Sequence, residues 1–104
     1  MSAKSTGRDA EIACVADLEK AGHLAFRVHL SQGPFDVVGI SVLGVRFIQV
    51  KARTKHMSDG LSPAQLEAMK EQIAPWLPPH ATFEIWVRGK INRRWKWVRQ
   101  ERLL

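Results

Sequence analysis

Two apolar runs separated by a short turn constrain the fold of this chain more than any other feature of its sequence. Residues 33–53 read GPFDVVGISVLGVRFIQVKAR, and the segments 35–40 and 45–51 have the length and β-branched content of strands. The short connection, in which Gly44 is a candidate for positive φ, favours an antiparallel hairpin. Asp36, Gln49 and Lys51 interrupt strands that are otherwise apolar enough to be buried, so these three residues need an explanation.

Alternation along the strands gives part of that explanation. Gln49 and Lys51 are two residues apart and therefore point to the same side. If Ile40 pairs with Val45, Asp36 comes opposite Gln49, and if the turn has two residues, Asp36 comes opposite Lys51. In either register the three polar side chains share one face of the hairpin, whereas an odd loop or a bulge would separate them.

The rest of the chain predicts a small mixed α/β sandwich in a single domain over residues 1–104, with residues 1–6 disordered. A first helix is expected over 8–21, ended by Gly22, and a strand over 24–29. Ser62, Pro63 and Gln65 form the capping box of a second helix, which Pro75 ends or kinks. Strands over 81–88 and 93–99 follow, joined by a turn at 89–92.

One acidic residue lies in the apolar stripe of the first helix. Cys14, Val15, Leu18 and Ala21 form that stripe, and Glu11 falls in the middle of it. A carboxylate that points inward needs a compensating partner. Alternatively, Glu11 sits in the first turn near the rim and interacts only with the helix dipole. The sequence leaves both interpretations open.

The charge balance favours a polyanionic partner. Sixteen Lys and Arg against ten Asp and Glu give a net charge of +6, which suits nucleic acid first and an anionic membrane surface second. A soluble basic domain without such a partner is the alternative. The single cysteine rules out an internal disulfide. With no signal peptide and no apolar window of ~18 residues, we expect a cytoplasmic protein that does not enter the membrane.

The polar residues of the helix and the hairpin form a chemically coherent set. Carboxylate and amide oxygens are ligands that suit Mg²⁺, and a neighbouring lysine can stabilise the charge that develops on a phosphate. Phosphodiester hydrolysis requires such a combination, and a basic surface would hold the polyanionic substrate against it.

These residues also carry a family resemblance. Glu11, Pro34-Phe35-Asp36 and Gln49-Val50-Lys51 resemble the signature of PD-(D/E)XK nucleases, and the region 7–55 is similar to archaeal-type Holliday junction resolvases and their phage relatives. The resemblance implies a restriction-endonuclease-like fold, with a central mixed five-stranded sheet flanked by two helices in the order α-β-β-β-α-β-β. It also implies a structure-selective DNA endonuclease that depends on Mg²⁺ or Mn²⁺ and acts on a four-way junction as a homodimer.

The resemblance assigns a role to each site residue. Asp36 would be the central metal ligand, Glu11 would support the site directly or through water, and Lys51 would be the catalytic lysine. Gln49 stands where the family usually has Glu or Asp, the carbonyl of Val50 is a further candidate ligand, and Ser31 matches a serine that these resolvases often carry on a mobile segment.

Gln49 is the departure from the family pattern that matters most. A neutral amide can ligate Mg²⁺ but supplies no charge, so the metal should bind more weakly, and Mn²⁺ should serve better. Two alternatives to the junction resolvase follow. One is a nuclease of the same superfamily for flaps, nicks or duplex ends, and the other is a catalytically silent DNA-binding module of the same fold.

Clustered basic residues indicate where DNA would lie. Trp95 and Trp97 share one face of the last strand and are expected in the core rather than as base-stacking platforms. The residues that we expect to contact the phosphate backbone are Arg8, Arg53, Lys55, Arg93, Arg94 and Lys96.

Overall fold

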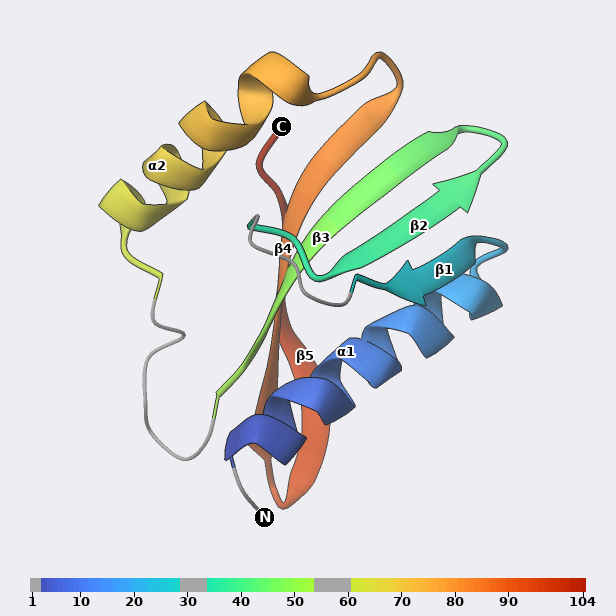
Figure 1. The fold of residues 1–104 in the computed structure, drawn as a ribbon. Coiled ribbons are helices and arrows are strands. Elements are labelled where there is room, and N and C mark those ends of the chain that lie inside the picture. The colour runs from blue at the N-terminus through green and yellow to red at the C-terminus, as the bar shows by residue number, and fades with distance from the viewer. Residues whose placement is uncertain (1–2, 29–33, 54–60) are drawn as a thin grey trace.

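The computed structural model describes residues 3–28, 34–53 and 61–104 and contains one five-stranded sheet between two helices (Figure 1). In chain order the elements are α1 (Ala3–Lys20), β1 (Leu24–Arg27), β2 (Val37–Ser41), β3 (Gly44–Ala52), α2 (Pro63–Ile73), the 3₁₀ turn η1 (Ala74–Trp76), β4 (Ala81–Ile91) and β5 (Arg94–Arg102). The strands lie side by side in sequence order, and only β3 and β4 run parallel. The predicted order of elements and the predicted fold class are therefore confirmed.

Helix α1 covers one face of the sheet, which we call the α1 face. Its residues Ala10, Cys14 and Leu18 are fully buried against a cluster that includes Ile48 of β3 and Trp86 of β4. Burial raises the pKa of the Cys14 thiol to about 12. In the predicted stripe, Val15 is only partly buried. Ala21 is exposed, because the helix ends at Lys20.

On the opposite face of the sheet, the α2 face, Ile73, Trp76 and Leu77 line a small pocket together with Phe35 and Phe47. The Phe35 and Phe47 rings lie 5.0 Å apart in a tilted arrangement, which suits aromatic packing. Within the described ranges, no helix has both the length and the apolar character needed to cross a membrane.

The helix ends follow their sequence signals, with one difference. Gly22 adopts a φ of 90°, and the backbone N–H of His23 donates to the carbonyl of Leu18 at 2.9 Å, which closes the C-terminus of α1. The Ser62 hydroxyl and the Gln65 side chain form the predicted capping box of α2. Helix α1 begins at Ala3 rather than at residue 8, so part of the segment that we expected to be disordered is helical.

The register of the β2–β3 hairpin is the first of the two that the sequence allowed. Ile40 pairs with Val45, and Ser41 pairs with Gly44 at the turn. Gly44 has a φ of 142°, and a Cβ there would lie 1.9 Å from the carbonyl oxygen of His80, so only glycine fits. That carbonyl accepts a hydrogen bond from the backbone N–H of Val45 at 3.0 Å, which ties the start of β3 to the residue before β4.

The β4–β5 hairpin differs from our prediction. Gly89 was expected in the turn, but it lies within β4 and is buried, with Val98 close to the position that a Cβ would take. The turn is instead made by Asn92 and Arg93, whose φ values of 51° and 65° match a two-residue turn of type I′. Both strands are consequently longer than the sequence indicated.

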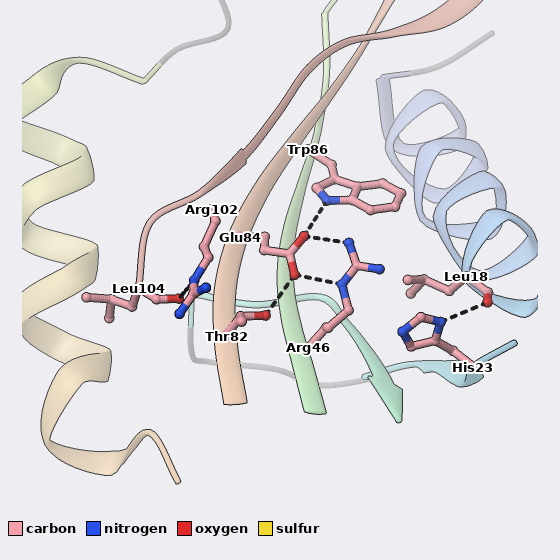
Figure 2. A network of polar contacts seen from close by, with 8 residues as sticks. All are labelled: Leu18, His23, Arg46, Thr82, Glu84, Trp86, Arg102 and Leu104. Carbon is pink, nitrogen blue, oxygen red and sulfur yellow. Dashed lines mark hydrogen bonds and ion pairs between the residues drawn. The ribbon is translucent and has the colours of Figure 1, made fainter. Parts of the chain in front are cut away.

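A buried carboxylate that the sequence analysis did not single out links β3 to β4. Glu84 is 7% exposed and accepts two hydrogen bonds of 2.7 Å from the guanidinium of Arg46 (Figure 2). The Thr82 hydroxyl and the Trp86 indole donate to the same carboxylate at 2.8 and 3.1 Å. Burial by itself raises the pKa of Glu84, but these hydrogen bonds outweigh it, and the pKa is lowered.

Replacing Glu84 by glutamine should therefore destabilise the fold. We expect Glu84→Gln to lower the free energy of unfolding by roughly 3 kcal/mol, because Arg46 keeps a half-buried charge without its counterion. Because the folded-state pKa of Glu84 is lowered, its stabilising effect is present above the unfolded-state pKa and disappears as the pH falls through the folded-state value. Urea unfolding of the wild type and of Glu84→Gln at neutral and acidic pH measures both the loss of stability in the variant and the pH dependence of the Glu84 contribution. If Glu84→Gln is as stable as the wild type at neutral pH, the network does not stabilise the fold.

Candidate active site

Asp36 lies immediately before β2, where three strands meet. Its backbone N–H donates to the Ile48 carbonyl of β3 at 2.8 Å, and its carbonyl accepts from Val28 at 2.8 Å, directly after β1. The side-chain oxygen Oδ2 accepts from the backbone N–H of Val50 at 3.0 Å. Three hydrogen bonds thus hold Asp36 in place, while Oδ1 accepts none from the described residues.

Charges from three other elements act on this carboxylate. Burial raises the pKa of Asp36, the hydrogen bond from Val50 lowers it, and the nearby charge of Glu11 raises it further. The cations Lys51 and Arg27 act in the opposite direction, and the net result is a raised pKa. The structure therefore brings Glu11 of α1 and Lys51 of β3 within electrostatic reach of Asp36.

The inward position of Glu11 is compensated by an arginine. Because α1 begins at Ala3, Glu11 is not in the first turn, and the interpretation that relied on the helix dipole is wrong. Its carboxylate accepts a hydrogen bond of 3.0 Å from Nε of Arg27 on β1, and both side chains are about a quarter exposed. Arg27 was not among the predicted site residues, although the alternation of the segment 24–29 placed a cation there.

Gln49 and Lys51 lie on the face of β3 opposite to α1. The neighbouring Ile48 and Val50 are buried under α1, and alternation turns Gln49 and Lys51 to the α2 face. Since the last pair of the hairpin is Val37 with Ile48, Asp36 comes opposite Gln49, as the first register predicted. Lys51 is exposed and Gln49 is half-buried.

The donor chemistry around Asp36 suits a hard cation that binds weakly. Among the residues that the structure describes, no group of three or more His, Cys, Asp or Glu side chains is placed to hold a metal ion. Glu11 is paired with Arg27, and Gln49 is neutral, so Asp36 is the carboxylate left for a cation. Oxygen donors of this kind fit Mg²⁺ or Mn²⁺ rather than a softer metal.

Some of the predicted DNA-binding residues lie on the same face of the sheet as Lys51, and others lie elsewhere. Arg53 follows Lys51 by two residues, and a Cβ on Gly89 of β4 would lie 3.5 Å from its Nε. Lys96 pairs with Gly89 and Arg94 with Ile91, which places both on the α2 face with Lys51. Arg93 forms part of the turn, and Arg8 is exposed on α1. Ser31 and Lys55 lie outside the described residues.

Comparison with known proteins supports the fold. The structure is similar to that of Hjc, a Holliday junction resolvase from the archaeal hyperthermophile Archaeoglobus fulgidus, with a TM-score of 0.54 and 26% sequence identity. The match covers 88% of this chain and 70% of Hjc. A scan against protein-family models gave no match, and a search of curated proteins gave none either. The chain therefore has the restriction-endonuclease-like fold that Hjc also has.

The raised pKa of Asp36 predicts a stability cost at neutral pH. A carboxyl whose folded-state pKa is raised stabilises the fold below its unfolded-state pKa and loses that effect as the pH rises through the folded-state value. We therefore expect Asp36→Asn, which keeps an acceptor for Val50, to be at least as stable as the wild type at pH 7. The difference should disappear near pH 3, below the ordinary value of 3.8. A marked loss of stability at pH 7 in thermal unfolding would show that the Asp36 carboxylate serves the fold.

Proposed function

We propose that this chain is a metal-dependent DNA endonuclease of the Holliday junction resolvase type, which hydrolyses phosphodiester bonds in branched DNA. The observation that carries the proposal is the half-buried Asp36 carboxylate, held at the strand ends within reach of Glu11 and Lys51. The likeness to the resolvase Hjc and the net charge of +6 support DNA as the substrate.

Each residue has a distinct task in the proposed reaction. Asp36 and Gln49 would hold the divalent cation through side-chain oxygens, and the carbonyl of Val50 is a further candidate. When bound, such a cation supplies a more acidic water and offsets the negative charge on the phosphate. Lys51 would stabilise the charge that develops as water attacks in line. Arg27 would keep the Glu11 carboxylate in position behind Asp36 through their 3.0 Å contact.

The partners follow from the proposed substrate. Arg53, Arg94 and Lys96 share the face of Lys51 and would hold the phosphate backbone beside the cleaved bond. Arg8, Arg93 and Lys55 would contribute further backbone contacts, and Ser31 would have the functional role that the family resemblance implies. Two matched cuts in a four-way junction call for two copies of the site, so we propose a symmetric homodimer.

The test is cleavage of a four-way junction in Mg²⁺ or Mn²⁺ by two site variants. We expect Asp36→Asn and Lys51→Ala each to reduce the rate by about 100-fold or more, the usual cost of losing a group that stabilises the transition state. Lys20→Ala, an exposed lysine at the far end of α1, is the matched control and should cleave normally. Cleavage that survives both site substitutions rejects the assignment. Flap, nicked and linear substrates tested in parallel identify the preferred DNA.

A catalytically silent DNA-binding module is the second candidate, and the neutral Gln49 favours it. Gln49→Glu separates the two, since it adds the missing carboxylate opposite Asp36. If the wild type is an enzyme, this variant should reach half-maximal cleavage at a lower metal concentration, because an added carboxylate increases the affinity for the cation. If the wild type is silent, the variant should gain metal binding measurable by calorimetry.

Gln72→Glu adds the same charge on an exposed position of α2 and should change neither property. Unchanged metal affinity in Gln49→Glu would show that residue 49 does not face the cation.

A further inference from the structure

The β4–β5 hairpin continues past the end of β3 as a two-stranded arm. The last pair between β3 and β4 is Ala52 with Arg88, so residues 89–96 pair only with each other. We call residues 88–97 the arm. In Figure 1 it reaches the lower end of the molecule. Its first residues adjoin the candidate site, because Lys51 pairs with Val87 and the N–H of Arg53 donates to the Arg88 carbonyl at 2.8 Å.

One side of the arm continues the surface of Lys51. Arg53, Lys96 and Arg94 project from this α2 face, since directly paired residues of neighbouring strands point to the same side. A DNA segment held at Lys51 would meet these cations first. These cations would therefore contact the branch of the DNA that is cut.

The other side of the arm carries two further cations, which lie over the indole ring of Trp95. Trp97 points to the α1 face, where its indole N–H donates to Asp17 of α1 at 2.6 Å. Trp95, two residues away, shares that face. The Arg88 guanidinium lies 5.2 Å and the Lys90 ammonium 5.7 Å from the centre of the Trp95 ring.

The indole orients these two cations without neutralising them. A cation–π contact of this kind restricts the side chain while its charge stays available. Within the described residues, neither Arg88 nor Lys90 forms an ion pair with a carboxylate. In the part of the chain that the structure describes, no carboxylate forms an ion pair with the cations on either face of the arm.

A single duplex laid against the candidate site would use only the α2 face of the arm. Cations fixed on the opposite face can neutralise a second phosphate backbone, and a branched DNA supplies one. We propose that Arg88, Lys90 and Trp95 form a second surface that binds the DNA backbone. This surface would hold one branch of a branched DNA, while the α2 face holds the branch that is cut. This inference rests on the proposed function, and it makes Trp95 a positioning residue.

The experiment compares binding of a four-way junction and of a linear duplex of equal length, without a cleaving metal, by fluorescence anisotropy over a range of salt concentrations. Arg88→Ala/Lys90→Ala should weaken junction binding and reduce its salt slope by about 1.8, because each lost phosphate contact accounts for ~0.9. Its affinity for the linear duplex should match that of the wild type. Arg94→Ala/Lys96→Ala should weaken binding to both DNAs.

Two further comparisons isolate the proposed surface. Lys20→Ala/Lys70→Ala removes the same charge outside the arm and should leave the preference for the junction intact. Trp95→Phe should keep that preference, and Trp95→Leu, which keeps apolar packing without a ring, should reduce it. Equal losses on junction and duplex for Arg88→Ala/Lys90→Ala, or no loss on either, would overturn the proposal. A wild type that prefers junctions but never cleaves them refutes the nuclease function alone.

Discussion

The pairing register of the β2–β3 hairpin is the constraint on which the candidate site depends. The pair Ile40 with Val45 brings Asp36 opposite Gln49 and sends Lys51 to the face away from α1. A shift of one residue would exchange the two faces of β3 and place these polar side chains under the helix. The close approach of Gly44 to the His80 carbonyl excludes any residue other than glycine at position 44. The same contact couples the hairpin to the parallel pairing of β3 with β4.

The carboxylates of Glu84 and Asp36 are both at least partly buried, but they differ in how far hydrogen bonds compensate their charge. Four hydrogen bonds compensate Glu84, and they lower its pKa despite its burial. Burial raises the pKa of Asp36, its one side-chain hydrogen bond does not offset this, and the negative charge of Glu11 raises the pKa further. An incompletely compensated carboxylate costs stability, and this is the usual condition of a group retained for binding or catalysis.

The features predicted correctly from the sequence depend on local rules. The capping box at Ser62, the end of α1 at Gly22 and the existence of the β2–β3 hairpin all follow from residues close together in the chain, although the sequence left two registers of that hairpin open. The features missed depend on distant partners. Neither the pair of Arg46 with Glu84 nor that of Arg27 with Glu11 has a sequence signal beyond alternation, since each joins separate elements. The turn predicted at Gly89 was wrong because close packing, rather than a positive φ, explains that glycine.

The buried thiol of Cys14 makes the seating of α1 on the sheet chemically observable. Its side chain is fully buried and its pKa is about 12, so essentially no reactive thiolate is present at neutral pH while the helix is in place. Alkylation of this single cysteine therefore requires α1 to detach, and the modification rate reports the opening equilibrium of that helix. Because α1 also carries Glu11, the same opening would dismantle the acidic surroundings of Asp36.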